Sequence, residues 1–560
     1  MIGISRRAGL AFCVAAAAIF SRPGHGFAQS ATTASDPTQI EQRLDDQQPR
    51  RPQILQPHLE VLPPSQITPI RDTFSFVLSA VIIDGATAFT RASLAPLYGK
   101  YLARRVTEVE VQEIAQSITR VYHDAGYVFS QADVPAQDVL AGVLKVRVTE
   151  GHVARIDYGG AGEKNGIVAA YMAPVLAEKP VRLETIERAM LLVNDLPGIT
   201  VVDASVGDGD EPVAKVLNLV LEKTAVNADL YVDNRGTPSS GRLQTWAAGA
   251  ANGLLSTGDR LQIGLFIVPD TPRELIYGQI KWSQPLGGWG TVGEVTLSGS
   301  KVDAGNSLAA SETESDSRRM QLSLRHPILR TRQDSLWASG EFDVYNVNED
   351  TFGATSYEDR NRTARLGLEY YRSKLLNGDF YAKAVYARGL DILGASNPGN
   401  GQLSRSDGKA AFDKVTLEVR RLQKLWGGFG LYAQAKGQWA NQPLLTGAEF
   451  SLGGSQYGRA FDYGELVGDR GAAGAVELRY TGKKPAYWIE SYDVYAFYDG
   501  GFVWNEGVGR QTLTSAGLGL RSTFAKGIYA DFQVAKPLNH EVSTEGDKDL
   551  RILFAVGAGM

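Results

Sequence analysis

The mature chain has almost no groups suited to thiol or metal chemistry. Cys13 is the only cysteine among the 560 residues, and it lies in an N-terminal segment typical of a secretory signal. Without that segment the protein has no thiol, no disulfide and no thiolate metal site. The six histidines are scattered, and the sequence has no paired-histidine zinc motif, phosphate-binding loop or nucleophile-elbow serine. We therefore expect no enzymatic activity, no cofactor and no bound metal.

The sequence also lacks a long uncharged apolar run and an excess of basic residues. No stretch of the length that a membrane-spanning helix needs is free of charge, so no helical span is predicted. The formal net charge of −5 argues against a nucleic-acid partner. Residues 288–293 match a dinucleotide-binding fingerprint, but the match bridges two predicted strands and begins no helix.

Residues 1–28 are predicted to be a signal peptide. Arg6 and Arg7 form its basic end, residues 8–20 its apolar run, and residues 26–28 the small-residue cleavage site. The paired arginines are compatible with a twin-arginine signal, but Gly9 stands where that motif prefers a bulky apolar residue. The general secretory route is therefore favoured, with cleavage after Ala28.

The next two segments are a short polar helix and a proline-rich linker. Asp36 and Pro37 begin the predicted helix within residues 29–48, which is either a plug for a wet pore or a frayed tail. Residues 49–73 are predicted to be extended, and at about 3 Å per residue about twenty of them reach on the order of 60 Å. That length exceeds a bilayer core of about 30 Å.

An internal repeat follows in residues 74–151 and 152–225. Each copy has the predicted order β-α-α-β-β, and the second helix of the first copy is capped by Thr107 with Glu110 three residues on. Strands at 128–134 and 199–206 are candidate sheet edges. They either bind another polypeptide, here called the client, as an extended chain, or act only as spacers. The candidate client-binding residues are Val128, Phe129, Gln131, Ile199, Val201 and Val202.

From residue 226 onward, apolar and polar residues alternate along the chain with a period of two. Leu366 and Leu368, for example, alternate with Arg365 and Glu369, which gives one apolar and one charged face. A soluble sandwich or a membrane barrel would account for this alternation. Sixteen predicted strands, eleven before and five after a loop at 441–473, are joined by alternating short turns and long polar loops. This pattern is typical of an outer-membrane barrel over residues 226–560.

Two segments of the barrel region carry the candidate site. Arg459 lies in the long loop, and Asp499 lies on a strand whose alternation directs it and Phe497 into the lumen. Glu477, on the preceding strand, faces the lumen as well. An arginine is always charged and pairs well with a carboxylate. From these residues alone, one interpretation is that Arg459 anchors the loop to Asp499, with Glu477 as the weaker candidate. The alternative is that Arg459 is a solvated loop charge.

The order of these segments resembles the two-partner secretion transporters of the haemolysin secretion/activation family over the whole mature chain. The repeats resemble tandem POTRA domains. In that family the sixth outer loop folds into the barrel and carries a Val-Arg-Gly-Phe or Val-Arg-Gly-Tyr motif. Here residues 458–461 read Gly-Arg-Ala-Phe, so Arg459 and Phe461 are kept while Gly458 and Ala460 depart from the motif. The family's Phe-x-Asp-x-Gly motif is matched in full by Phe497, Asp499 and Gly501.

The resemblance implies α+β periplasmic POTRA domains followed by an all-β, sixteen-stranded antiparallel transmembrane barrel. It implies a monomer in the outer membrane of a Gram-negative bacterium, in contact with lipid. Its partner would be a large unfolded exoprotein, haemolysin- or adhesin-like, which crosses the barrel without nucleotide hydrolysis. The alternatives are an outer-membrane assembly factor, whose relatives usually carry more POTRA units, a passive porin, and an enzyme with a barrel body. The terminal Met560 differs from the aromatic residue common at the end of such barrels.

Overall fold

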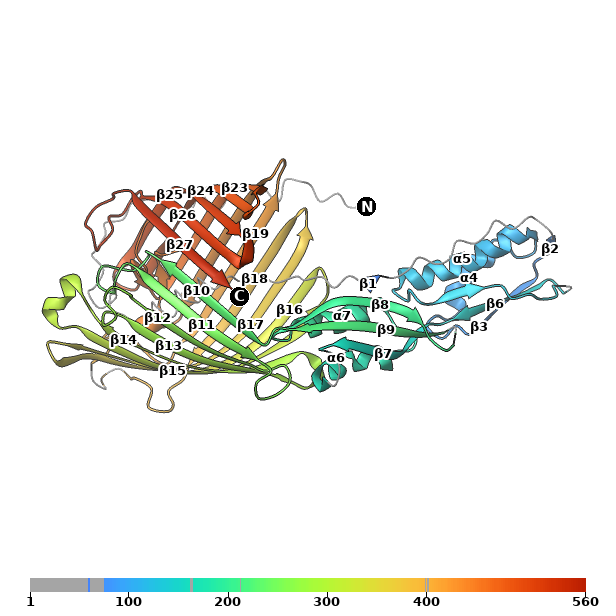
Figure 1. The fold of residues 1–560 in the computed structure, drawn as a ribbon, viewed down its shortest axis with the longest axis horizontal. Coiled ribbons are helices and arrows are strands. Elements are labelled where there is room, and N and C mark those ends of the chain that lie inside the picture. The colour runs from blue at the N-terminus through green and yellow to red at the C-terminus, as the bar shows by residue number, and fades with distance from the viewer. Residues whose placement is uncertain are drawn as a thin grey trace.

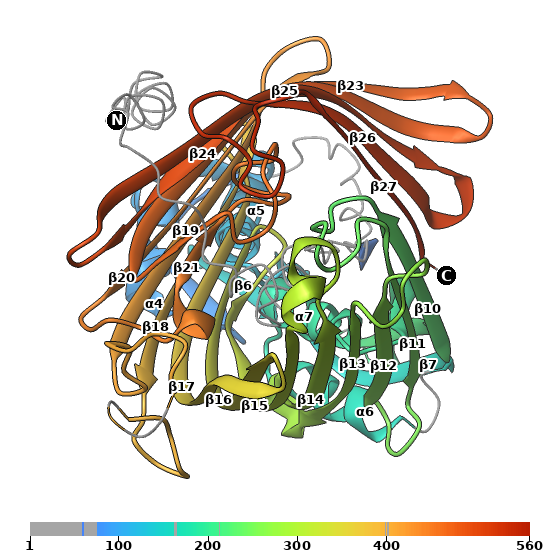
Figure 2. The same cartoon turned by 90° about the vertical axis from the view of Figure 1, so that its left-hand side faces the viewer.

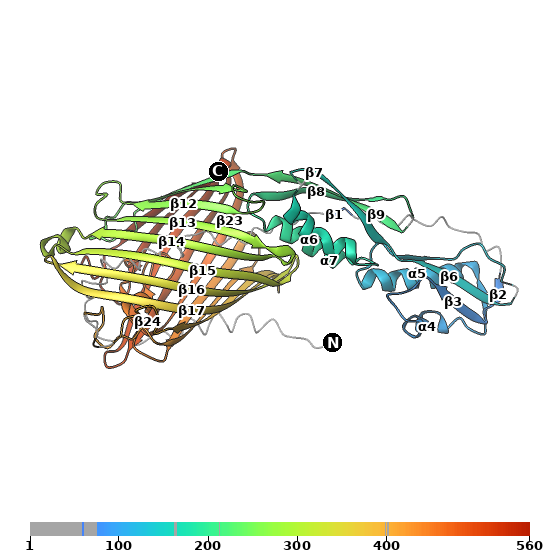
Figure 3. The ribbon, with the colours of Figure 1, turned by 90° about the horizontal axis from the view of Figure 1, so that it is seen from below.

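The protein is elongated, with a closed barrel at one end and two α+β units extending from it in line (Figures 1 and 3). The computed structural model describes residues 59–60, 75–139, 141–161, 165–211, 213–397, 399 and 402–559. The predicted signal peptide, the plug helix, most of the linker and Met560 lie outside these residues. Within the described ranges, no helix is both long enough and apolar enough to cross a membrane.

The first α+β unit is built around one amphipathic helix, α5 (Glu108–Asp124). The predicted capping box is present: Thr107 Oγ1 accepts from Glu110 N at 3.4 Å, and Glu110 Oε2 accepts from Thr107 N at 2.9 Å. The apolar face of α5 is buried in a core that the surrounding elements complete. These elements are β2 (Ser75–Val77), β3 (Ala80–Asp84), α4 (Arg91–Gly99), β4 (Arg105–Thr107), β5 (Gln131–Asp133) and β6 (Val143–Thr149).

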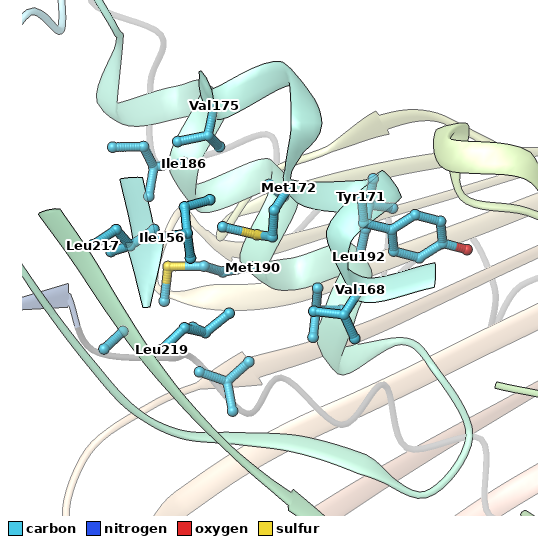
Figure 4. Close-up of a cluster of buried hydrophobic side chains, with 14 of the residues drawn as sticks. Ile156, Val168, Tyr171, Met172, Val175, Ile186, Met190, Leu192, Leu217 and Leu219 are labelled. Carbon is cyan, nitrogen blue, oxygen red and sulfur yellow. The ribbon is translucent and has the colours of Figure 1, made fainter. Parts of the chain in front are cut away.

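The second unit packs two helices on one face of a sheet. Figure 4 shows side chains of α6 (Gly166–Ala177) and α7 (Leu183–Asn194) meeting those of the strands, with Met172 and Met190 at the centre. The sheet has the order β1-β8-β9-β7, in which β1 (Leu59–Glu60) comes from the linker. The other strands are β7 (His152–Gly160), β8 (Ile199–Asp208) and β9 (Ala214–Lys223).

Sixteen strands close the barrel, each pairing antiparallel with its neighbours, and the last pairs with the first. The predicted fold class and the division into eleven strands and five strands around one long loop are therefore confirmed. The sixteen barrel strands are β10 (Val226–Asp233), β11 (Gln244–Asn252), β12 (Arg260–Ile267), β13 (Ile276–Leu286), β14 (Thr291–Asp303), β15 (Glu314–Arg330), β16 (Asp334–Thr351), β17 (Ala354–Leu375), β18 (Gly378–Gly389), β19 (Asp413–Lys424), β20 (Phe429–Ala440), β23 (Arg470–Ala486), β24 (Ile489–Asn505), β25 (Gly509–Phe524), β26 (Ile528–Pro537) and β27 (Arg551–Gly559).

The barrel turns apolar side chains outward and charged side chains inward. Leu366 and Leu518 are among the most exposed leucines, at 66% and 64%, whereas the lumen residues Asp343 and Glu477 are buried. An apolar outer face around a charged lumen is the side-chain distribution typical of outer-membrane barrels.

The second unit is fixed to the barrel by ion pairs at the turn between β15 and β16. Arg330 binds Asp195 through two contacts of 2.8 Å, from Nε and from Nη2. Arg332 Nε lies 3.1 Å from Glu187 Oε1 on α7. A two-pronged arginine contact restricts orientation as well as distance. The unit therefore has a defined position at the inner mouth of the barrel.

Candidate functional site

The loop between β20 and β23 folds back against the inner wall of the barrel, which Figure 2 shows from the end opposite the α+β units. It contains the short hairpin β21 (Phe450–Leu452) and β22 (Leu466–Gly468). Its apolar residues form one buried cluster with residues of the barrel strands. The loop is therefore packed into the barrel rather than extended into solvent.

Arg459 lies at the tip of this loop, and its side chain is 3% exposed. Its Nη1 is 2.6 Å from Glu477 Oε1, and its Nε is 2.7 Å from Asp499 Oδ2. The Nε contact is an ion pair without hydrogen-bond alignment. The guanidinium carbon lies 4.1 Å from the ring centre of Phe497, a cation–π distance. The alternative of a solvated loop charge is therefore wrong.

Asp499 also holds the backbone of the loop tip. Its Oδ1 accepts from Gly458 N at 3.0 Å, from Arg459 N at 3.2 Å, and from the hydroxyl of Ser515. The Ser515 hydroxyl in turn accepts from Ala460 N at 3.4 Å. Sequence reasoning missed Ser515. The signal for it is positional, because Ser515 is the register partner of Asp499 on the next strand.

Glu477 is as close to Arg459 as Asp499 is, so ranking it as the weaker partner was wrong. Its second oxygen accepts from Arg479 Nε at 2.5 Å, and one carboxylate is thus shared by two arginines. Glu477 and Arg479 lie two residues apart on β23 and both face the lumen. Such a buried network is stabilising only while every charge keeps a partner.

The remaining motif residues shape the space around this network. Phe461 is buried, and its ring centre lies 6.0 Å from that of His540. A Cβ at Gly501 would lie 2.8 Å from Leu452 Cδ2, so glycine lets β21 pack directly against β24. The departure at Gly458 has a physical reason: its φ of +80° favours glycine, and a Cβ there would lie 2.4 Å from Leu513 Cδ1.

A second group of charges, not identified from the sequence, holds the base of the loop. Arg405, in the outer loop between β18 and β19, places Nη1 2.7 Å from Glu449 Oε1 and 2.7 Å from Asp469 Oδ1. Both carboxylates are buried, and they belong to the two arms of the in-folded loop. Arg405 therefore joins those arms.

The predicted client-binding edge at 128–134 is largely wrong. Val128 and Phe129 lie in a turn closed by the bond from Ser130 N to Tyr127 O at 3.0 Å, and Phe129 packs against the core of the second unit. Gln131 does begin a strand, but β5 has three residues. The N–H of Ala132 at its centre already donates to a threonine hydroxyl.

The edge predicted at 199–206 is present as β8. Ile199 and Val201 are buried toward the core, so only their backbone could meet a partner, whereas Val202 is 52% exposed at a bulge. The linker strand β1 already pairs with Ala204 and Ser205. Within the described chain, the first half of β8 has no strand partner on its edge away from β9. On that half, Ile199 N already donates to Leu196 O at 3.2 Å, and Val201 N donates to Asn194 Oδ1 at 2.6 Å.

A closed sixteen-stranded barrel with an apolar outer face, an in-folded loop and preceding α+β units defines an outer-membrane protein transporter. Its sequence matches the profile of the haemolysin secretion/activation protein family ShlB/FhaC/HecB over residues 216–522. The chain belongs to this family and is a two-partner secretion transporter. Residues 76–151 match the POTRA domain, ShlB-type.

The chain is similar in sequence to curated relatives and similar in fold to solved structures. The heme/hemopexin transporter protein HuxB of Haemophilus influenzae strain 86-028NP is 21% identical over 464 residues, which cover 80% of this chain and 81% of HuxB. The structure of CdiB from Escherichia coli is similar with a TM-score of 0.77 at 22% identity, over 96% of this chain and 100% of that chain. The crystal structure of BamA from Haemophilus ducreyi lacking POTRA domains 1–3 is more distant, with a TM-score of 0.51 at 13% identity, over 87% of this chain and 100% of that chain.

Proposed function

We propose that this transporter takes a large unfolded exoprotein from the periplasm and passes it through the barrel lumen to the cell surface. The two POTRA units lie in the periplasm and bind the client as an extended chain. Folding of the client outside the cell, rather than nucleotide hydrolysis, drives export. The protein acts as a monomer in contact with outer-membrane lipid, and residues 29–48 plug the lumen between transport events.

The observation that carries this proposal is the buried contact of Arg459 with Asp499 and Glu477 on the lumen wall. A passive pore does not need a loop held inside it by two ion pairs and a cation–π contact. A transporter that must stay closed until a client arrives does need such an anchor. We therefore assign Arg459, Asp499 and Glu477 as a lock that holds the in-folded loop, supported by Phe461, Phe497 and Gly501.

Client binding fits β8 better than β5. On the edge away from β9, the first half of β8 has no strand partner in the described chain, and the exposed side chain of Val202 lies beside it. A client strand there would replace the bonds that Ile199 N and Val201 N make to Leu196 O and Asn194 Oδ1. The added client strand would lie beside β8. The next strand of that sheet, β9, ends only a few residues before β10, the first strand of the barrel. The bound segment would therefore already lie near the inner mouth of the barrel.

An assembly factor that inserts barrel proteins into the membrane is the second candidate, because the barrel shares its fold with BamA. The two functions differ in what accumulates when the protein is absent. Loss of a secretion transporter leaves one exoprotein unexported, whereas loss of an assembly factor depletes many outer-membrane proteins. Comparing the outer-membrane and secreted proteomes of a deletion strain with the parent strain separates them.

The lock is tested by Arg459→Ala with Arg319→Ala as the matched control. Arg319 is a lumen arginine that pairs with Asp343 on the neighbouring strand. We expect Arg459→Ala to reduce exported client at least tenfold, Arg319→Ala to change it little, and both barrels to keep their heat-modifiable gel mobility. Equal export from the two variants would contradict the lock.

A further inference from the structure

The shortest strand pairing in the barrel wall is the seam between its first and last strands. β10 and β27 pair only over Asp229–Asp233 and Ala555–Gly559, which is five register pairs. Every other neighbouring pair in the barrel is joined over at least eight. With fewer backbone hydrogen bonds, this seam depends more on its side chains than the other strand pairs do. Figure 2 shows β27 and β10 side by side at this closing point.

Side chains extend the seam at its outer end. Asn234 follows β10 and makes three bonds to β27: its N donates to Phe554 O at 3.3 Å, its Nδ2 donates to Ile552 O at 2.9 Å, and its Oδ1 accepts from Phe554 N at 2.8 Å. Arg235 Nη2 reaches across to Gln533 Oε1 on β26 at 2.7 Å. Residues just beyond the short ladder thus continue it with one backbone bond and three side-chain bonds.

Four charges lie above this polar extension, and we call them the seam clasp: Arg242, Asp462, Glu545 and Arg551. Arg551 Nη2 is 2.6 Å from Asp462 Oδ1 and 3.9 Å from Glu545 Oε1. Arg242 contacts Glu545 closely and lies 3.7 Å from Asp462. Each arginine is thus within ion-pair reach of both carboxylates, and the formal charges cancel.

The seam clasp joins three separate segments of the chain. Arg242 lies in the loop after β10, and Asp462 lies in the in-folded loop. Glu545 lies in the loop before β27, and Arg551 is the first residue of β27. Asp462 and Arg551 are the buried half, with side chains 2% and 8% exposed, whereas Arg242 and Glu545 are partly solvated. Arg551 Nη1 also donates to Ala460 O at 3.1 Å, next to Arg459.

We propose that Asp462 and Arg551 are positioning residues that couple the in-folded loop to closure of the barrel. While the loop is seated, Asp462 neutralises Arg551 and draws the β27 side of the seam toward Arg242 on the β10 side. Withdrawal of the loop removes Asp462 and leaves a buried arginine with one distant partner, which loosens the seam. This inference deepens the proposed lock and rests on it, because the same four-residue loop tip carries Arg459 and Asp462.

Hydrogen exchange of the full-length protein in detergent micelles tests the coupling. In Asp462→Asn and in Arg551→Gln we expect peptides from β10 and β27 to exchange about tenfold faster, which corresponds to about 1.4 kcal/mol. The double variant should exchange no faster than either single variant, because both remove one contact. Asp343→Asn, which removes an equally buried lumen carboxylate on β16, should leave the seam peptides unchanged.

Two further measurements keep the test decisive. Glu545→Gln lies on the solvated side of the clasp and should speed seam exchange by a smaller factor, even if the buried variants fold poorly. A disulfide between cysteines placed at the register partners Val232 and Val556 should restore slow exchange in Asp462→Asn, and the mature chain has no other cysteine to interfere.

The result that overturns the coupling is unchanged exchange of β10 and β27 in folded Asp462→Asn and Arg551→Gln. Failure of the proposed coupling is distinguishable from failure of the lock. Reduced export by Arg459→Ala with an unchanged seam in Asp462→Asn would keep the lock and overturn the coupling. Normal export by Arg459→Ala with faster seam exchange in Asp462→Asn would overturn the lock and support the contact of Asp462 with the seam.

Discussion

Asp499 and Ser515 face each other across β24 and β25 and together bind three consecutive backbone amides of the loop tip. Asp499 Oδ1 accepts from the amides of residues 458 and 459, and Ser515 Oγ accepts from that of Ala460. The side chain of Arg459 then closes the contact from the other side of the same carboxylate. The loop tip is thus held by its backbone as well as by its charge, and a test of the lock must separate these two contributions.

Arg459 and Asp499 should behave as one unit in export. Arg459→Ala leaves Asp499 without its cation, whereas Asp499→Ala leaves Arg459 with Glu477 alone and also removes the acceptor of two loop-tip amides. Breaking the Arg459–Asp499 pair costs about 3 kcal/mol in a well-buried site. The double variant should export about as much client as the worse single variant, because one contact is lost in all three. Lys at position 459 should restore export only in part, because it lacks the planar fork.

The measurement is the amount of exported client, with heat-modifiable mobility as the folding control. Strictly additive losses would contradict the pairing with Asp499. In that case Glu477→Gln becomes the informative variant, since its carboxylate is equally close to Arg459.

Restoring the family's valine at position 458 should impair this protein. Gly458→Val must adopt a φ of +80° and places a Cβ 2.4 Å from Leu513 Cδ1. The left-handed backbone alone costs roughly 1–2 kcal/mol for a residue with a Cβ. We expect reduced export, and Gly458→Val with Leu513→Ala should recover only the steric part. Wild-type export by Gly458→Val would show that the loop tip tolerates another backbone conformation.

Pro at Val202 should weaken client binding by β8. Val202 is the bulged residue of β8 and has no register partner on β9, and the substitution removes its backbone N–H. Val202→Thr keeps the N–H and is the matched control. Binding of an unfolded client fragment to the full-length protein should fall about tenfold for the proline variant only. Equal affinities of the two variants would rule out this edge.

Glu150 should make the first POTRA unit sensitive to acid. Burial acts to raise the pKa of Glu150, but hydrogen bonds from Ala88 N, from Thr87 and from Tyr122 outweigh it and hold that pKa below its usual value. A lowered folded-state pKa contributes stability that is complete above the unfolded value of about 4.3 and is lost as pH falls through the folded value.

Glu150→Gln should therefore lower the protection of α5 against hydrogen exchange at pH 7 by about 1–2 kcal/mol. The difference from the wild type should shrink as pH falls below about 4.3, because a protonated Glu150 then resembles glutamine. A difference that stays constant with pH would mean that the carboxylate charge contributes nothing to this unit.

Removing the predicted plug should open the pore. Deletion of residues 36–48 leaves Leu59–Glu60 free to pair with β8, so a change can be assigned to the helix rather than to the linker strand. We expect a higher single-channel conductance in planar bilayers. A conductance equal to that of the wild type would contradict the plug.

Interactions between residues close together in the chain determined the helices and strands of this protein and the direction that their side chains face. The Thr107–Glu110 capping box depends on residues three apart. The period-two alternation directs Glu477 and Asp499 into the lumen independently of the rest of the barrel. Local sequence left Arg459 open as a solvated charge, and its place in the family's loop motif, with the matching motif at Asp499, made the anchor predictable.

Contacts between residues distant in the chain were decided only by the tertiary structure. Whether Arg459 reaches Asp499, Glu477 or both depends on how deeply the loop enters the lumen, which no local pattern specifies. Phe129 looked like part of a strand because it is apolar and follows a helix, but packing against the second unit holds it in a turn. Asp462 and Arg551 are 89 residues apart and meet only because closing the barrel brings β27 beside the in-folded loop. Side-chain alternation predicts which face a charge lies on, whereas its partner depends on the closure of the whole barrel.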